Sequence, residues 1–277
     1  MSRLKKALEK AKKDFSNIQL YNTENQEPSV AVEPEKKTSL RKVAKVDFSQ
    51  TKIQPISHIV LKNNRIVALF SNYKVTDQIK ALRTQVLKKL EKIGSNTLMV
   101  TSANPREGKT FTSINLGISI AQELDRTVLI IDADLKNPAK NHCDFATDFL
   151  SIDVEKGLAD VLLGNIKLAD ALINPGIDKL TVLPGGYFLH NSCELLGSPQ
   201  MELLFKDVKS RYKDRVVIID TPAILSCADP IVISKFAENI LFVVEEEKTS
   251  TEDIRQSMNQ LSDVNIIGMV INKSKSK

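Results

Sequence analysis

The sequence predicts an α/β protein with a doubly wound, mostly parallel sheet, preceded by a flexible N-terminal extension. From residue 97 onward, short apolar runs alternate with segments of helical periodicity. The runs are apolar throughout, which is typical of parallel strands covered on both faces of a sheet. Polar residues gather where the runs end, and doubly wound sheets bind their ligands at the carboxyl ends of the strands.

Each element of this domain is expected from its own pattern. The expected strands are residues 98–101, 128–132, 180–183, 216–220, 240–244 and 266–272. The expected helices are residues 75–93, 111–124, 157–173, 199–212, 229–237 and 250–262. In the first helix the stripe that would be buried consists of Ile79, Leu82, Val86, Leu87 and Leu90.

The chain divides into three predicted parts. Residues 1–14 are expected to form a basic amphipathic helix, residues 15–52 a disordered linker, and residues 53–277 the P-loop domain. The apolar stripe of the first helix consists of Leu4, Ala7, Leu8 and Ala11. This helix is compatible with a solvated or partner-docking role, or with weak adsorption to a membrane surface.

The composition of the chain limits the classes of protein to which it can belong. Lys and Arg number 39 against 34 Asp and Glu, and the excess lies largely at the two ends, which argues against a broad nucleic-acid face. Cys143, Cys193 and Cys227 lack the spacing of a metal site, and their odd number fits a reducing cytoplasm. No apolar run approaches the ~18 residues of a membrane helix. We therefore expect a cytoplasmic protein that does not span a membrane by itself.

The run Ala103-Asn-Pro-Arg-Glu-Gly-Lys-Thr110 has the pattern of a phosphate-binding loop between a strand and a helix. In such a loop the amides face the phosphates, the lysine reaches the β/γ oxygens, and the hydroxyl ligates magnesium. Ala103 stands where the common pattern has Gly, and an ordinary strand-to-helix turn is the alternative. The predicted nucleotide contacts are Ala103, Asn104, Pro105, Arg106, Glu107, Gly108, Lys109, Thr110 and Phe111.

Three aspartates follow apolar runs. Asp132 and Asp134 lie two residues apart and would point the same way in a strand, and Asp220 ends another run. Carboxylates beside a phosphate loop can hold magnesium and accept a proton from a nucleophile. Aspartate is also common at strand-end turns, so each pattern is weak alone, but the three elements in this order predict a nucleotide site.

Further segments complete a recognisable set. They are Asn115-Leu-Gly117, Ile131-Asp-Ala-Asp-Leu-Lys-Asn-Pro138, Gly157-Leu-Ala-Asp-Val-Leu-Leu-Gly164, Val182-Leu-Pro-Gly-Gly186, Glu194-Leu-Leu-Gly-Ser198, Asp220-Thr-Pro222 and Ala228-Asp-Pro230. With the loop, they resemble the bacterial tyrosine kinases of exopolysaccharide and capsule export, a branch of the partition and septum-site ATPases. The resemblance covers roughly residues 75–272. The N-terminal basic helix and linker also resemble forms encoded beside exosortase-type polysaccharide loci.

This resemblance implies an ATP- and magnesium-dependent protein-tyrosine kinase that controls exopolysaccharide polymerisation and export. By position, Lys109 and Thr110 would hold the β/γ-phosphates and magnesium. Asp132 and Asp220 would hold magnesium directly or through water. Asp134, or Asp132, would take the tyrosine proton, so the implied catalytic residues are Lys109, Asp132 and Asp134.

The resemblance also implies partners. Asp77, Lys80 and Arg83 have the spacing of the family's self-assembly motif and would dock a neighbour in a ring, unless they form a plain solvated salt-bridge face. A separate membrane co-polymerase protein and a protein substrate with a tyrosine are the other implied partners, with no nucleic acid. Asn272 stands where related ATPases often contact adenine.

Two departures bear on activity. No tyrosine follows Tyr212, so the chain lacks the family's C-terminal acceptor cluster, and Tyr21 is the substitute candidate. Lys136 replaces the usual Arg and loses its planar fork for phosphate. Two alternatives therefore stay open. One is a partition or septum-site-type switch ATPase that cycles on a membrane or partner, although its signature lysine early in the loop is missing. The other is a nucleotide-binding scaffold.

Overall fold

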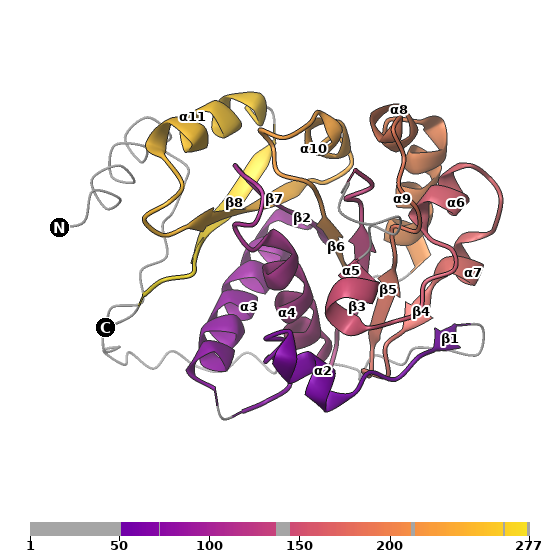
Figure 1. Cartoon of the computed structure of the whole chain (residues 1–277), viewed down its shortest axis with the longest axis horizontal. Helices are drawn as coiled ribbons and strands as arrows, with labels where there is room; N and C mark the ends of the chain where they lie inside the picture. Colours follow the sequence, from indigo (N-terminus) through magenta and orange to yellow (C-terminus); the bar gives the residue numbers. More distant parts are fainter. Residues whose placement is uncertain (1–50, 72, 137–144, 212–213, 263, 276–277) are drawn as a thin grey trace, which may run out of the picture.

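An eight-stranded sheet forms the centre of the protein (Figure 1). The computed structural model describes residues 51–71, 73–136, 145–211, 214–262 and 264–275. The strands are β1 (Lys52–Ile53), β2 (Thr97–Ser102), β3 (Thr127–Asp132), β4 (Ile173–Asn174), β5 (Leu180–Leu183), β6 (Arg215–Asp220), β7 (Asn239–Glu245) and β8 (Asn265–Asn272). The helices are α2 (His58–Asn63), α3 (Lys74–Ile93), α4 (Lys109–Ala121), α5 (Phe145–Leu150), α6 (Leu158–Leu162), α7 (Leu168–Ala171), α8 (Ser192–Leu196), α9 (Pro199–Arg211), α10 (Asp229–Ile233) and α11 (Thr251–Gln260).

The sheet is mostly parallel, with the strand order β1-β4-β5-β3-β6-β2-β7-β8. Among the described strands, only β4 and β5 pair antiparallel, through Ile173 and Val182. Parallel neighbours need a crossover connection, and helices supply it between the central strands. The predicted doubly wound, mostly parallel fold is therefore confirmed.

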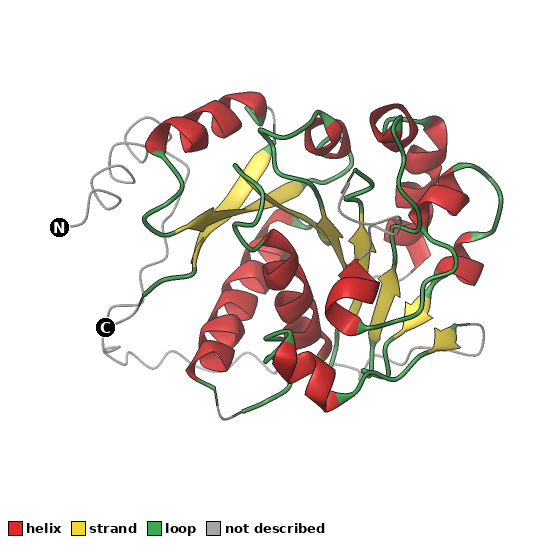
Figure 2. Cartoon of the chain, in the orientation of Figure 1, coloured by secondary structure: helices red, strands yellow, loops and turns green. Residues whose placement is uncertain are grey.

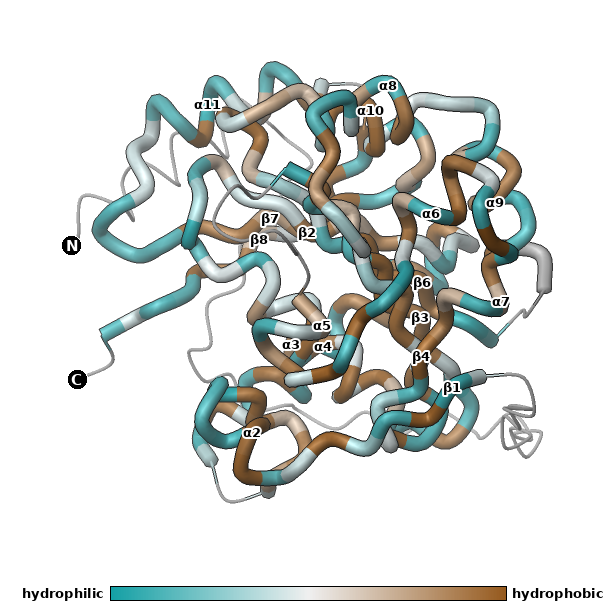
Figure 3. The backbone as a smooth tube through the Cα atoms, turned by 45° about the vertical axis from the view of Figure 1, so that its right-hand side comes forward, coloured by the Kyte–Doolittle hydropathy of each residue, from teal (hydrophilic) through white to brown (hydrophobic). Residues whose placement is uncertain are grey.

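Helices cover both faces of the sheet (Figure 2). Successive residues of a strand face opposite sides. In β2, Leu98 and Val100 pack in the core that includes α3 and α4, whereas Met99 packs in the core that includes α9, α10 and α11. Figure 3 shows the central strands as mainly hydrophobic segments inside the molecule. Burial on both faces explains why the strands read as unbroken apolar runs.

The helix expected at residues 75–93 is α3, which begins one residue earlier at Lys74. Its buried residues include Ile79, Val86 and Leu90, as the apolar stripe predicted. Gly94 follows the helix with φ 73°, and its backbone N–H bonds to carbonyls of the last turn. Glycine adopts this left-handed conformation without a steric penalty, so the chain can turn directly into β2.

The prediction of a single helix over residues 157–173 is wrong. That segment contains α6, a turn at Gly164 with φ 77°, α7, and then β4. Similarly, α10 ends at Ile233 rather than near residue 237. The sequence also did not predict the short elements β1, α2, α5 and α8. Helices of five or six residues contain too few turns to display a period, and tertiary contacts stabilise them.

The N-terminal predictions fall mainly outside the described residues. The basic helix expected at residues 1–14 lies there, and so does the linker expected at 15–52 up to residue 50. β1 begins at Lys52 and pairs with β4. Within the described part of the chain, no helix has both the length and the apolarity needed to cross a membrane.

Two of the motif segments meet at the carboxyl end of β5. The backbone N–H of Leu158 donates to Pro184 O at 2.7 Å, and that of Ala159 donates to Gly185 O at 3.1 Å. A Cβ atom on Gly157 would lie 2.4 Å from Gly186 N and 2.5 Å from Pro184 O. Only glycine therefore allows α6 to begin directly against this turn.

We predict that Gly157→Ala lowers the free energy of unfolding by about 2–3 kcal/mol, because the new methyl group would clash with backbone that cannot rotate away. Gly164→Ala is the matched control. At Gly164 a Cβ meets nothing within 4 Å, and only its φ of 77° is unfavourable, so the expected loss is about 1 kcal/mol. Urea denaturation measures both values, and equal losses would contradict the close contact.

Candidate nucleotide site

The carboxyl ends of β2, β3 and β6 lie side by side at one edge of the sheet. β6 is the middle strand of the three, and Asp220 at its end pairs in register with Asp132 of β3 and Val100 of β2. The loop of residues 103–108 leaves β2 at this same edge and leads into α4. Parallel pairing therefore brings the loop and the aspartates together, as the sequence predicted.

The loop has the backbone of a tight cradle. Arg106 and Gly108 have positive φ values of 65° and 101°. Ala103 is fully buried in the core beneath the loop, so its methyl group packs where the common pattern has Gly. Pro105 and Arg106 are exposed. Glu107 is buried. The remaining predicted contacts are half-buried, and they are Asn104, Gly108, Lys109, Thr110 and Phe111.

Lys109 lies close to one carboxylate and influences a second. Its Nζ is 3.7 Å from Asp134 Oδ2, and its charge also acts on Asp220. Ser113 donates its hydroxyl to Asp220 Oδ1 at 2.9 Å, a contact that the sequence did not predict. The structure therefore gathers Lys109, Thr110, Asp134 and Asp220 at the first turn of α4.

Burial dominates the electrostatics of this group. It raises the pKa of Asp220 from its ordinary 3.8 to about 6, although the Lys109 charge and the hydroxyls of Thr110 and Ser113 oppose the change. Burial also raises the pKa of Asp134, again against the attraction of Lys109. Both carboxyl groups would therefore bind a proton more readily than an exposed aspartate does.

Asp132 has a different environment. Its side chain is buried, Oδ1 accepts from the backbone N–H of Asp134 at 3.0 Å, and Oδ2 accepts from that of Phe145 at 2.8 Å. β3 ends at Asp132. The alternation of side chains along a strand therefore does not extend to Asp134, and it no longer supports the expectation that the two side chains point the same way. In this structure Asp132 fixes the turn that carries Asp134.

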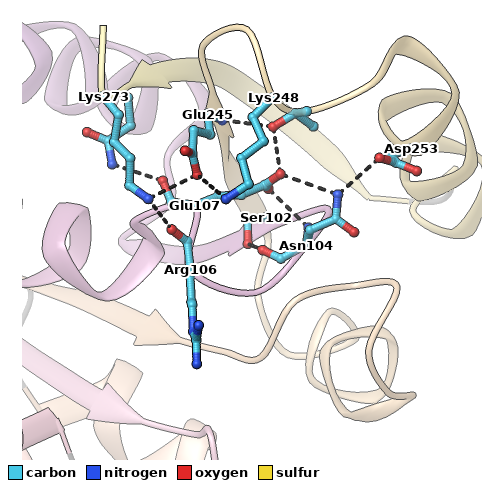
Figure 4. Close-up of polar contacts among 10 residues, drawn as sticks. Ser102, Asn104, Arg106, Glu107, Glu245, Lys248, Asp253 and Lys273 are labelled. Atoms are coloured by element: carbon cyan, nitrogen blue, oxygen red, sulfur yellow. Dashed lines mark hydrogen bonds and ion pairs between the residues drawn. The ribbon is translucent and has the colours of Figure 1, made fainter.

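A network of hydrogen bonds braces the loop from α11, from the turn that precedes it, and from β8 (Figure 4). Glu107 is 2% exposed, and its carboxylate accepts from Asn104 N at 3.1 Å and from Thr249 Oγ1 at 2.6 Å. The Asn104 side chain donates to Asp253 Oδ2 at 3.1 Å. Asn272 Nδ2 donates to Glu107 O at 2.9 Å. Sequence reasoning missed Thr249 and Asp253, because they lie more than a hundred residues along the chain without a local motif.

A second cluster links the turn after β3 to α8 and α10. Asp229 is fully buried, and its carboxylate accepts from Lys136 Nζ at 3.1 Å and Ser192 Oγ at 2.5 Å. Lys136 is thus held by a carboxylate. Asp229 lies in the Ala228-Asp-Pro230 segment, so the signal was present, but its partners were not predictable from sequence.

Asp77, Lys80 and Arg83 do not share one environment. Lys80 Nζ lies 3.8 Å from Asp77 Oδ1, and both side chains are well exposed. Arg83 instead turns onto α4, where its Nε is 2.8 Å from Glu123 Oε1 and its Nη1 donates to Ser119 O at 3.0 Å. Arg83 therefore contacts residues of its own chain. Assembly of several chains into a ring through these three residues stays a prediction.

This strand order, with a phosphate-binding loop and aspartates at one sheet edge, defines a P-loop nucleotide-binding domain. More particularly, the chain belongs to the AAA domain family (AAA_31), whose family model matches residues 95–273.

The chain is similar to bacterial tyrosine kinases. It is 31% identical over 198 residues to the tyrosine-protein kinase Etk of Escherichia coli K12, covering 71% of this chain but only 26% of that protein. The solved kinase domain of Escherichia coli Etk has a TM-score of 0.68 at 28% identity, covering 82% of this chain and 92% of that domain. The predicted resemblance to this family is confirmed.

A more distant neighbour has the same fold. The septum site-determining protein MinD of Pyrococcus horikoshii, solved with Mg-ADP, has a TM-score of 0.52 at 23% identity, covering 65% of this chain and 72% of that one. This likeness concerns the fold alone.

We predict that Asp220→Asn stabilises the nucleotide-free protein at pH 7. The pKa of Asp220 is raised in the folded state, so the unfolded chain ionises first and stability falls as pH rises from about 4 to above 6. A rise from 3.8 to about 6 corresponds to at most about 3 kcal/mol, and we expect a gain of about 1–3 kcal/mol. Thermal and urea unfolding at pH 4 and pH 7 measure it.

Asp132→Asn is the matched control for this measurement. Both Asp132 oxygens accept backbone N–H groups, and an asparagine offers one acceptor in place of two, so this variant should lose stability. A loss of stability in Asp220→Asn at pH 7 would contradict the account of its charge.

Proposed function

We propose that this protein is an ATP- and magnesium-dependent protein-tyrosine kinase that controls exopolysaccharide polymerisation and export. The observation that carries the proposal is the convergence of Lys109, Thr110, Asp134 and Asp220 where the loop enters α4. The names of the relatives support the choice of activity, because Etk is a tyrosine-protein kinase. The chain spans only a quarter of that protein's length, so its substrate and partners are part of the proposal.

The residues fit a magnesium–nucleotide complex. Magnesium prefers oxygen ligands, and the Thr110 hydroxyl and the Asp220 carboxylate supply them beside the loop. When bound, magnesium would neutralise charge on the phosphate oxygens. We assign Asp132 to this site as a support or a water-mediated ligand, since its oxygens already accept two backbone N–H groups.

Asp134 is the proposed base. Its carboxylate is 23% exposed and lies near Lys109, so it is accessible to an acceptor and close to the loop. A raised pKa suits a group that takes a proton during reaction at neutral pH. The phenolic proton would pass to Asp134 as the new P–O bond forms and the bond to the ADP leaving group breaks. Lys109 would hold the β/γ oxygens in line for this transfer.

The acceptor lies on another protein or on Tyr21. In this sequence the last tyrosine is Tyr212, and we place the acceptor outside the segment that follows it. We further propose a cytoplasmic location at the inner membrane face, through a separate membrane co-polymerase protein. Assembly through Asp77 and Lys80 remains part of this proposal, with Arg83 released from Glu123 or acting indirectly.

A switch ATPase is the second candidate. The shared fold with MinD supports it, because that septum site-determining protein was solved with Mg-ADP. Hydrolysis would then release ADP and free phosphate without a phosphorylated acceptor, and association would depend on ATP.

We predict that the purified protein with ATP and magnesium phosphorylates tyrosine on a candidate substrate, and that Lys109→Ala abolishes this signal. Asp134→Asn should lower kcat by about 10²- to 10³-fold while the Kd for ATP changes little, because it removes the base and leaves the loop intact. Phosphotyrosine immunoblotting and ATP titration measure these quantities.

Lys206→Ala is the matched control, because Lys206 is an exposed lysine on α9. It should leave phosphorylation unchanged. ADP and free phosphate without phosphotyrosine, over a range of substrates, would remove the kinase and favour the switch ATPase.

A further inference from the structure

Two donors from the end of β8 bond to backbone carbonyls of the phosphate loop (Figure 4). Asn272 Nδ2 donates to Glu107 O at 2.9 Å, and Lys273 Nζ donates to Arg106 O at 2.7 Å. These carbonyls belong to consecutive residues directly before Gly108. The end of the last strand therefore holds two adjacent peptide groups of the loop.

The direction of these bonds fixes where the loop amides point. In a planar trans peptide, the carbonyl of one residue and the N–H of the next point in opposite directions. Holding Arg106 O toward Lys273 therefore turns the N–H of Glu107 the other way, and holding Glu107 O toward Asn272 does the same for Gly108. Loop amides that point into the cradle are the groups that bind phosphate oxygens.

Both donors are themselves held in place. Asn272 pairs in register with Glu245 of β7, and its carbonyl accepts from Glu246 N at 3.0 Å. Lys273 Nζ lies 2.9 Å from Glu245 Oε2, which fixes its direction. A Cβ atom on Gly108 would lie 1.9 Å from Asn272 Nδ2, so the loop glycine and Asn272 fit closely together.

We propose that Asn272 and Lys273 are positioning residues for phosphate binding: they orient the Glu107 and Gly108 amides toward the phosphates of the nucleotide. The inference rests on the proposed nucleotide binding and deepens it. It also gives Asn272 a role different from the adenine contact that the family resemblance implies, because its amide already donates to the loop carbonyl.

The two roles of Asn272 differ in which ligands they affect. A positioning role acts on the phosphates, so its loss weakens every ligand that carries them, whatever the base. An adenine contact acts on the base, so its loss weakens ATP and leaves GTP and inorganic tripolyphosphate unchanged.

The experiment titrates the full chain with ATP, GTP and inorganic tripolyphosphate in the presence of magnesium. Asn272→Ala and Lys273→Met should each raise the Kd for ATP about fivefold, the usual effect of one hydrogen bond, and should raise it by the same factor for any of the other two ligands that binds. Lys273→Arg should restore most of the affinity, because arginine retains a donor.

Lys248→Met is the matched control. Lys248 Nζ lies 3.3 Å from the same Glu245 carboxylate, so this variant also removes a nearby positive charge. Its side chain is 65% exposed, and we expect the Kd to stay within twofold. Unfolding midpoints of all variants show whether each protein is folded, and a circular dichroism spectrum confirms the native secondary structure.

Three results would overturn the inference. One is a loss at Asn272→Ala confined to ATP, which assigns Asn272 to the base. Another is a Kd of the Lys273→Met variant equal to that of Lys248→Met, which would mean that Lys273 contributes only its positive charge. The third is the absence of ATP binding by the unsubstituted chain, which removes the nucleotide site as well. Normal binding without phosphotransfer would instead remove only the kinase assignment and leave the positioning role supported.

Discussion

Parallel pairing of β6 between β2 and β3 is the constraint on which the site depends. It places Asp220 in register with Asp132 on one side and beside the loop from β2 on the other. Strands in parallel register end at the same edge, so residues that are far apart in sequence become neighbours without any dedicated contact. A shift of one residue in β6 would turn Asp220 to the opposite face of the sheet.

The site is built from groups whose burial opposes folding. Asp220 is buried near Lys109, and its pKa is raised because burial disfavours its negative charge. Glu107 and Asp229 are also buried, and each carboxylate accepts at least two hydrogen bonds from residues that the fold supplies. Asp220 likewise accepts from the hydroxyls of Ser113 and Thr110, yet burial raises its pKa to about 6. The burial of Asp220 beside the phosphate loop would suit the proposed magnesium ion, and it reflects the general conflict between activity and stability.

Local patterns predicted the fold and the centre of the site, and distant contacts escaped them. Unbroken apolar runs gave the central strands, and the loop motif with Asp132, Asp134 and Asp220 gave the sheet edge where they meet. Short helices such as α5 and α8 were missed because they display no period and depend on tertiary packing. The contact of Thr249 with Glu107 spans 142 residues, so no local pattern could contain it. The expectation that Asp132 and Asp134 point the same way assumed strand geometry at both residues, but β3 ends at Asp132.

The contact between Asn272 and Glu107 joins residues 165 positions apart, and this separation has a consequence for the order of synthesis. Chains are made from the N-terminus, so the phosphate loop leaves the ribosome long before β8 does. Until β8 pairs with β7, the Arg106 and Glu107 carbonyls lack the donors that β8 brings. A growing chain would therefore carry the complete motif without these two bonds, and its affinity for nucleotide would reach the full value only when the sheet is complete.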